Sequence, residues 1–84
     1  MPTAFVLINS ELSYDGEIIA KIKEILGVDS NLKYQIQGVY GIYDIVLKVS
    51  SDDGPKLRKK ITNEIRKIDK VKSTLTMIVI EEQE

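Results

Sequence analysis

The sequence contains no cysteine and no histidine. Without cysteine there is no disulfide framework and no thiol nucleophile. Without histidine the chain lacks the commonest metal ligand and the most frequent general base. Neither a Cys-His pair nor a Ser-His-Asp triad can be built, and no phosphate-binding or dinucleotide-binding glycine motif is present. We therefore expect no enzymatic activity, no metal site and no cofactor.

The sequence also lacks a long apolar run and a surplus of charge. No segment approaches the roughly 20 apolar residues of a membrane-spanning helix. The start, Met1-Pro2-Thr3, has no basic region of a secretory signal, and the first apolar run ends at Ile8. The formal net charge of -1 argues against a dedicated nucleic-acid binder. We expect a cytoplasmic protein that binds neither membranes nor, directly, nucleic acids.

The length of 84 residues predicts one domain, residues 1–84. A content of 43% hydrophobic and 30% charged residues is typical of a folded domain. A chain this short buries only about 60% of its unfolded surface, and small domains without disulfides often gain stability by forming oligomers. The abundance of isoleucine and lysine hints at a thermophilic archaeal source.

Hydrophobic periodicity divides the chain into six elements. Four segments are predicted strands, at 3–9, 31–40, 43–50 and 71–81, and two are predicted helices, at 16–26 and 55–68. Asp15 is placed to cap the first helix and Gly27 to end it. Pro55 falls in the first turn of the second helix. Gly41 and Ile42 fit a two-residue type II′ turn between the second and third strands.

The order βαββαβ predicts an α+β, ferredoxin-like sandwich with a four-stranded antiparallel sheet and two helices on one face. Alternation of apolar and polar residues over 32–37 suits an edge strand with one wet face. The other three strands carry apolar side chains on both faces. Because two helices can cover only one face, a second copy of the chain is the simplest cover for the other.

Asp44 stands at the start of the apolar third strand, directly after the hairpin. An aspartate there commonly accepts hydrogen bonds from local backbone amides. It could also serve a ligand, because a free amino acid needs an anion for its ammonium group and N–H donors for its carboxylate. On position alone, the structural interpretation is favoured.

Two further sets of polar residues have similar alternatives. Thr74 and Thr76 share one face of the last strand, where they either reflect ordinary β-propensity or direct two hydroxyls at a ligand. On position alone, propensity is favoured. The paired carboxylates at 52–53 and 81–82 lie in segments expected to be exposed, where they solvate a loop and a terminus.

The second helix and the segment after it are basic. Such a run can contact phosphates, but it is more often the solvated face of a helix, and no aromatic side chains are interleaved to stack on bases. RNA-recognition motifs share the βαββαβ order but need stacking aromatics on the central strands, where only Phe5 and Tyr43 are found. We reject that interpretation. The basic residues are Lys56, Arg58, Lys59, Lys60, Arg66, Lys67, Lys70 and Lys72.

Two segments together resemble a known family. Residues 41–49, Gly-Ile-Tyr-Asp-Ile-Val-Leu-Lys-Val, are similar to its G-x-Y-D strand. Residues 65–76 are similar to its helix-to-strand segment ending in T-x-T, and the run 77–80 also fits. In this order and spacing, the chain from Thr3 to Glu82 resembles the effector-binding domain of the leucine-responsive regulator/AsnC (Lrp/AsnC) family, the RAM module.

The resemblance implies a domain that dimerises through its sheet, as in a dimeric α/β barrel. It implies dimers that assemble further, commonly as a ring of four dimers, an octamer. It also implies that an amino acid binds between dimers near the hairpin, which favours the functional interpretation of Asp44 and of the two threonines. The ligand-site residues carried over are Tyr40, Gly41, Ile42, Tyr43, Asp44, Thr74 and Thr76.

The chain departs from the family pattern at two points. Full regulators carry an N-terminal helix-turn-helix domain, whereas this chain begins at the first strand, so it resembles the stand-alone form without a DNA-binding domain. Tyr40 replaces a small hydroxyl residue and would narrow or reshape the pocket.

The predicted function is binding of an apolar or branched-chain amino acid, since the pocket strands show no charge beyond Asp44. Such a sensor could modulate transcription through full-length Lrp/AsnC regulators. The alternatives are a ligand-free oligomerisation partner and, less favoured, a nucleic-acid binder that uses the basic second helix.

Overall fold

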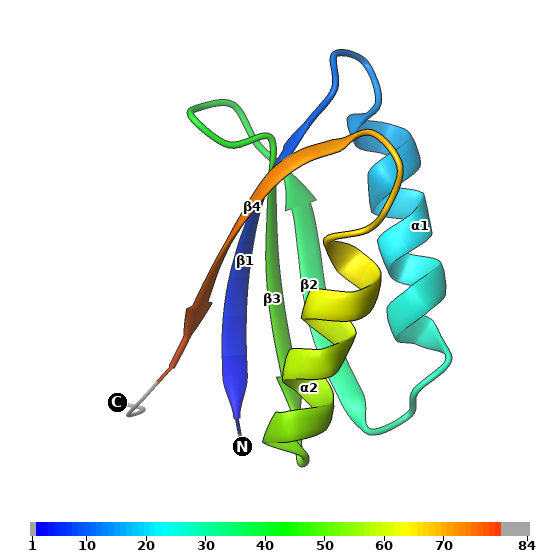
Figure 1. Cartoon of the computed structure of the whole chain (residues 1–84), viewed down its shortest axis with the longest axis vertical. Coiled ribbons are helices and arrows are strands. Elements are labelled where there is room, and N and C mark those ends of the chain that lie inside the picture. Colours follow the sequence, from blue (N-terminus) through cyan, green and yellow to red (C-terminus); the bar gives the residue numbers. More distant parts are fainter. Residues whose placement is uncertain (1, 80–84) are drawn as a thin grey trace.

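Four strands and two helices follow one another in the order βαββαβ in the computed structural model, which describes residues 2–79 (Figure 1). The expected α+β, ferredoxin-like fold is confirmed. The elements are β1 (Thr3–Ser10), α1 (Asp15–Gly27), β2 (Leu32–Gly38), β3 (Ile45–Ser51), α2 (Gly54–Lys60), a π-helical turn η1 (Ile61–Ile65) and β4 (Val71–Ile78).

The sheet has the strand order β2-β3-β1-β4, and every neighbouring pair is antiparallel. β2 is an edge strand, as its alternating sequence predicted, and β4 is the other edge. β1 lies at the centre, where Ile8 is opposite Ile45 of β3 on one side and Thr74 of β4 on the other. Residues directly opposite each other point to the same face of a sheet, so these pairings determine which side chains share a face.

Both helices cover one face of the sheet (Figure 1). α1 buries the stripe Ile18, Ile22 and Leu26, and α2 with η1 buries Leu57, Ile61 and Ile65. Fully burying a side chain of this size contributes about 1.5–3 kcal/mol, so these contacts dominate the stability of the fold. They pack on alternate residues of the two central strands, Ala4, Val6, Ile8, Ile45, Leu47 and Val49.

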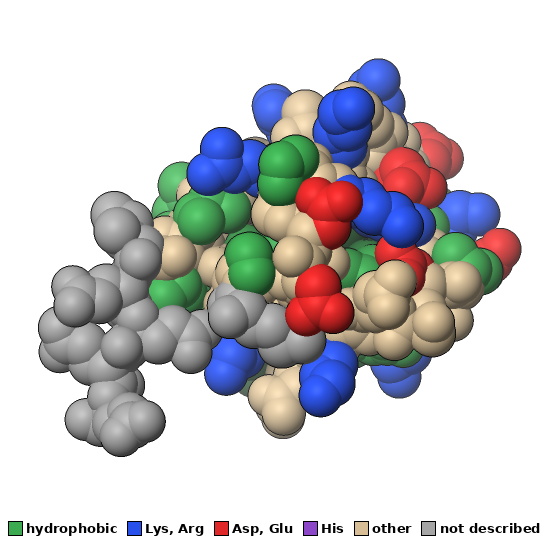
Figure 2. Space-filling view, turned by 90° about the horizontal axis from the view of Figure 1, so that it is seen from below, with side chains coloured by type: hydrophobic (Ala, Val, Ile, Leu, Met, Phe, Trp, Pro, Cys, Tyr) green, Lys and Arg blue, Asp and Glu red, His purple; other side chains and the backbone are tan. Residues whose placement is uncertain are grey.

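The other face of the sheet, which we call the open face, has no helix over it within residues 2–79. Leu7 lies between Val46 and Leu75, and Phe5 lies between Lys48 and Met77, so apolar side chains form two adjoining rows. Leu75 is 45% exposed and Met77 is 46% exposed. Figure 2 shows the molecule from below, and hydrophobic side chains gather on its left side. The lower end of β4 lies on the same side in Figure 1.

The hairpin between β2 and β3 differs from the expected two-residue turn, so that prediction is wrong. β2 ends at Gly38 and β3 begins at Ile45, and residues 39–44 form a wider loop. The Val39 N–H donates to the Asp44 carbonyl at 2.8 Å, whereas the Asp44 N–H donates to Ile8 of β1 at 3.0 Å. The backbone of Asp44 is therefore hydrogen-bonded to Val39 on one side and to Ile8 of β1 on the other, and the chain beyond Val39 leaves the β2–β3 ladder. Within the loop, Gly41 has a φ of 154°, which glycine adopts far more readily than other residues.

Three other predicted boundaries also need correction. Asp15 is the first residue of α1 and not its N-cap; that position is held by Tyr14, without a side-chain cap. The second helix does not run regularly to Ile68, because a π-helical turn replaces its last α-helical turn, with the Arg66 N–H donating to the Ile61 carbonyl at 3.1 Å. β4 ends at Ile78, and the expected strand residues beyond Val79 lie outside the described part of the chain.

No helix within residues 2–79 is long and apolar enough to cross a membrane.

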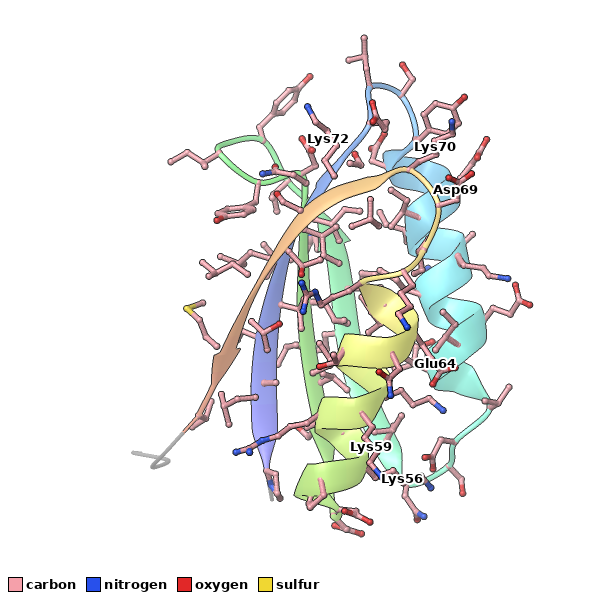
Figure 3. All side chains as sticks on the ribbon, in the orientation of Figure 1. Lys56, Lys59, Glu64, Asp69, Lys70 and Lys72 are labelled. Atoms are coloured by element: carbon pink, nitrogen blue, oxygen red, sulfur yellow. The ribbon has the colours of Figure 1, made fainter. Side chains whose placement is uncertain are left out.

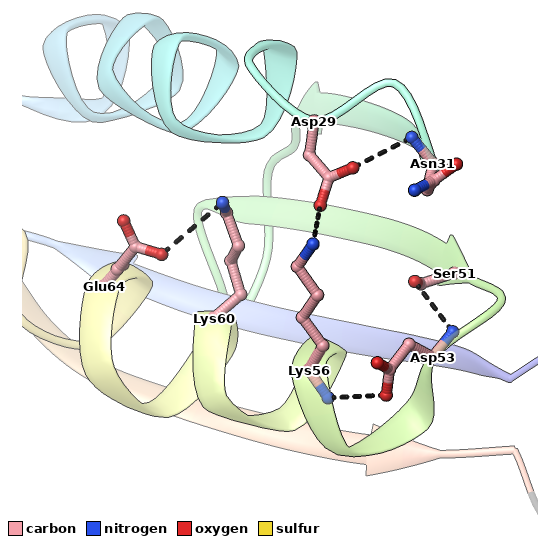
Figure 4. A network of polar contacts seen from close by, with 7 residues as sticks. All are labelled: Asp29, Asn31, Ser51, Asp53, Lys56, Lys60 and Glu64. Atoms are coloured by element: carbon pink, nitrogen blue, oxygen red, sulfur yellow. Dashed lines mark hydrogen bonds and ion pairs between the residues drawn. The ribbon is translucent and has the colours of Figure 1, made fainter.

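A polar network ties α2 to the loop before β2 (Figure 4). Asp53 caps α2, because its Oδ1 accepts from the Lys56 N–H at 3.1 Å. Lys56 Nζ lies 3.2 Å from Oδ2 of Asp29, and Oδ1 of Asp29 accepts from the Asn31 N–H at 2.9 Å. The backbone hydrogen bond from Asn31, and then the lysine, hold the pKa of Asp29 below its ordinary value. The carboxylate form is therefore the one that this network stabilises.

Replacing Asp53 with alanine should lower the free energy of unfolding by about 0.5–2 kcal/mol, because the first turn of α2 loses its cap. Asp52→Ala is the matched control, since it removes a neighbouring exposed carboxylate that makes no cap. Urea denaturation at one fixed protomer concentration measures both. An equal loss in the two variants would contradict the capping role.

Replacing Asp29 with asparagine should lower the melting temperature more at pH 7 than at pH 3. The pKa of Asp29 is lower in the folded than in the unfolded chain, so its contribution is present above the unfolded pKa and is lost as the pH falls through the folded pKa. Thermal unfolding of both proteins between pH 7 and pH 2 measures the difference. A melting-temperature gap that does not shrink on acidification would contradict this assignment.

Candidate functional site

Two loops at one end of the sheet enclose an open cleft of about 720 Å³. One loop joins β1 to α1 and the other joins β2 to β3. The volume is within the range of about 300–1,000 Å³ found for small-molecule sites. The lining residues are Ser10, Glu11, Leu12, Ser13, Asp15, Gly38, Val39, Tyr40, Asp44 and Lys72.

Asp44 holds the two loops together. Its Oδ2 accepts from the Ser10 N–H at 2.9 Å and from the Ser10 hydroxyl at 3.4 Å. The structural interpretation of Asp44 was correct in that its carboxylate binds a backbone amide, but that amide belongs to Ser10, the last residue of β1, and is not local in sequence. Within residues 2–79, Oδ1 of Asp44 has no hydrogen-bond partner. One oxygen thus builds the cleft and the other is available inside it.

Both loops expose large apolar side chains at or beside the cleft. Leu12 of the first loop is 90% exposed, and Tyr40 and Ile42 of the second loop are also fully or almost fully exposed. Tyr40 lines the cleft, whereas Gly41, Ile42 and Tyr43 belong to the same loop but do not line it. Large apolar side chains that gather at an exposed rim indicate contact with a ligand or with another subunit.

The predicted threonines lie elsewhere. Thr74 and Thr76 are opposite Ile8 and Val6, so they point to the helix-covered face of the sheet near its β4 edge. Thr74 is half-buried and lines a separate hollow of about 260 Å³ with Arg66, whereas Thr76 is exposed. Neither threonine lines the cleft. A single chain therefore does not bring the two predicted halves of the site together.

Eight lining residues were not predicted from the sequence: Ser10, Glu11, Leu12, Ser13, Asp15, Gly38, Val39 and Lys72. Five of them belong to the β1–α1 connection and its two ends. The antiparallel order places the end of β1 beside the start of β3, so a sheet order inferred from the βαββαβ pattern would have placed these loops together. Lys72 left no such signal, since in the sequence it is one lysine among several.

Four of the eight basic residues of the second helix and the segment after it contact other side chains or line the cleft; Lys56, Lys70 and Lys72 are labelled in Figure 3. Lys56 pairs with Asp29, and Lys60 lies 3.7 Å from Glu64. Lys70 Nζ lies 5.1 Å from the centre of the Tyr14 ring, and Lys72 belongs to the cleft. This arrangement weakens the nucleic-acid interpretation, because contacts to phosphates require unpaired cations on a common face.

The fold is that of a small α+β domain with an open cleft at one end of its sheet. The chain matches the family model described as the Lrp/AsnC ligand binding domain over residues 3–83. It therefore belongs to the Lrp/AsnC family. No curated protein matches the chain.

Solved structures agree with this assignment. FFRP-DM1 is 35% identical with a TM-score of 0.76, and the match covers 95% of this chain and 100% of that one. A hypothetical protein from Pyrococcus horikoshii is 35% identical with a TM-score of 0.74, over 98% and 93% of the two chains. A transcriptional regulator from Neisseria meningitidis, solved as a complex with L-Met, shares the fold at 11% identity and a TM-score of 0.71, over 99% and 52% of the two chains.

Replacing Asp44 with alanine should expose the Ser10 amide to solvent and speed its hydrogen exchange by at least about tenfold, because a hydrogen bond to a charged acceptor contributes about 1.5–3 kcal/mol. Asp44→Asn keeps an acceptor oxygen and should show a smaller effect. Amide exchange followed by NMR measures both variants. Unchanged exchange at Ser10 in the alanine variant would show that Asp44 does not hold the loop.

Proposed function

We propose that the cleft binds a free amino acid with an apolar or branched side chain. The observation that carries this proposal is the carboxylate of Asp44, which is fixed through one oxygen and leaves the other for a ligand ammonium group. Leu12, Val39 and Tyr40 offer apolar surface in the same cleft. The complex of the N. meningitidis regulator with L-Met supports the same class of ligand.

The proposed binding unit is an oligomer. The uncovered rows of Leu7, Phe5, Leu75 and Met77 suit a dimer that stacks two open faces. Further assembly, with a ring of four dimers as the expected form, would cover Leu12, Tyr40 and Ile42 around the cleft. It would also allow Thr74 and Thr76 to reach a ligand from a neighbouring subunit, although they do not line the cleft of their own chain.

The proposed role is to report the amino-acid level to transcription. In this role the domain joins full-length Lrp/AsnC regulators. The matches to FFRP-DM1 and to the P. horikoshii protein span 100% and 93% of those chains, so those two chains consist almost entirely of this domain.

Calorimetric titration with all twenty amino acids should detect binding of at least one apolar amino acid. Asp44→Ala should reduce that affinity at least about tenfold, because the ligand ammonium loses a charged acceptor. Asp52→Ala is the control for the loss of a carboxylate. Wild-type protein that stays assembled yet binds none of the amino acids at millimolar concentration would instead favour the ligand-free oligomerisation partner.

Replacing Leu75 with lysine should weaken the dimer at least tenfold, because an ammonium group would be buried among apolar side chains without a partner. Asn63→Lys adds the same charge on the exposed surface of η1 and should leave the dimer intact. Sedimentation velocity over a range of concentrations measures the equilibrium, and circular dichroism verifies that both variants fold. Equal sedimentation of the two variants would exclude the open face as the dimer interface.

A further inference from the structure

The ladder between β1 and β4 is interrupted at one residue. Asn9 is opposite Ser73, but Ser10 is opposite Val71, so the pairing skips Lys72. The ladder resumes where the Glu11 N–H donates to the Lys70 carbonyl at 2.8 Å. Lys72 is therefore the extra residue of a β-bulge. A bulge bends its strand and turns a side chain away from the direction that regular pairing would give it.

The bulge presents Lys72 to the cleft. Figure 3 shows Lys72 at the start of β4, beside the loop that joins β2 and β3, and its side chain lines the cleft together with Asp44. Within residues 2–79, Lys72 forms no ion pair, either with Asp44 or with any other carboxylate. An unpaired cation and an available carboxylate oxygen thus face the same space.

The balance of charge makes this lysine distinctive. The cleft is lined by three carboxylates, those of Glu11, Asp15 and Asp44, and Lys72 is the one basic residue among the ten lining residues. A ligand that carries a carboxylate would meet mainly negative charge if Lys72 were absent. The ammonium of lysine is a compact charge on a flexible stem, which lets it follow a carboxylate across an open cleft.

We propose that Lys72 binds the α-carboxylate of the amino-acid ligand, opposite the pole at which Asp44 binds its ammonium group. This assignment rests on the proposed amino-acid site and adds a residue and an orientation to it. A zwitterion held in this way lies between β4 and the β2–β3 loop. Its side chain is then directed to the apolar rim of Leu12, Val39 and Tyr40.

The test compares amino acids with their α-carboxamides, which keep the ammonium group but lack the carboxylate. The probes are L-leucine, L-isoleucine, L-valine and L-methionine, each with its carboxamide, titrated by calorimetry. Wild-type protein should bind at least one of these amino acids about 10- to 100-fold more tightly than the carboxamide. Lys72→Gln should lose that preference, with the loss in the amino acid and little change in the carboxamide. Lys72→Arg should retain most of the preference.

Lys59→Gln is the matched control, because it removes one positive charge from an exposed position on α2, far from the cleft in Figure 3. It should bind as wild type does. If wild type binds an amino acid and Lys72→Gln binds it within threefold, or loses acid and carboxamide equally, the role of Lys72 is overturned while the amino-acid site stands. If wild type binds none of the four amino acids, this assignment fails, and the twenty-amino-acid titration decides whether the site itself fails too.

Discussion

The alternation of side chains along β1 is the constraint on which the rest of the molecule depends. β1 is hydrogen-bonded on both sides, so each of its residues has a fixed opposite number on β3 and on β4. Its even-numbered residues Ala4, Val6 and Ile8 are fully buried under the helices, and Phe5 and Leu7 must then point to the open face. A slip of one residue would exchange the two sets. The same central strand therefore positions the core and the apolar surface left for a partner.

The cleft is a consequence of the same pairing, extended beyond the ends of the strands. β1 and β3 are antiparallel, so the loop after β1 and the loop before β3 emerge at the same end of the sheet. The hydrogen bond from the Ser10 amide to Asp44 then joins the end of β1 to the loop before β3. Since Asp44 is anchored to β1 through its own N–H, a ligand at its carboxylate would be held by a residue that is tied to an inner strand of the sheet. The bulge at Lys72 places a charge of opposite sign across from it.

Periodicity and family resemblance together predicted the six elements, their order, the edge position of β2 and the uncovered second face. They predicted the β2–β3 loop as part of the site through the G-x-Y-D segment, and Asp44 and Tyr40 do line a cleft there. They did not predict the loop length, because Gly41 and Ile42 look like a complete turn until the pairing of Asp44 with β1 is known. Lys72 could not be predicted, because its direction depends on a bulge that local sequence does not signal.

The π-helical turn at the end of the second helix affects how this chain is compared with relatives. Leu57, Ile61 and Ile65 are four residues apart, and in an α-helix of 3.6 residues per turn each such step rotates a side chain by about 40°. The wider π-helical turn from Ile61 to Ile65 reverses part of that rotation about the helix axis, so the side chain of Ile65 stays buried over the sheet. A relative with a plain α-helical turn here would need one residue fewer to reach β4. An alignment that allows no gap between residues 61 and 65 would then shift the T-x-T segment out of step by one position.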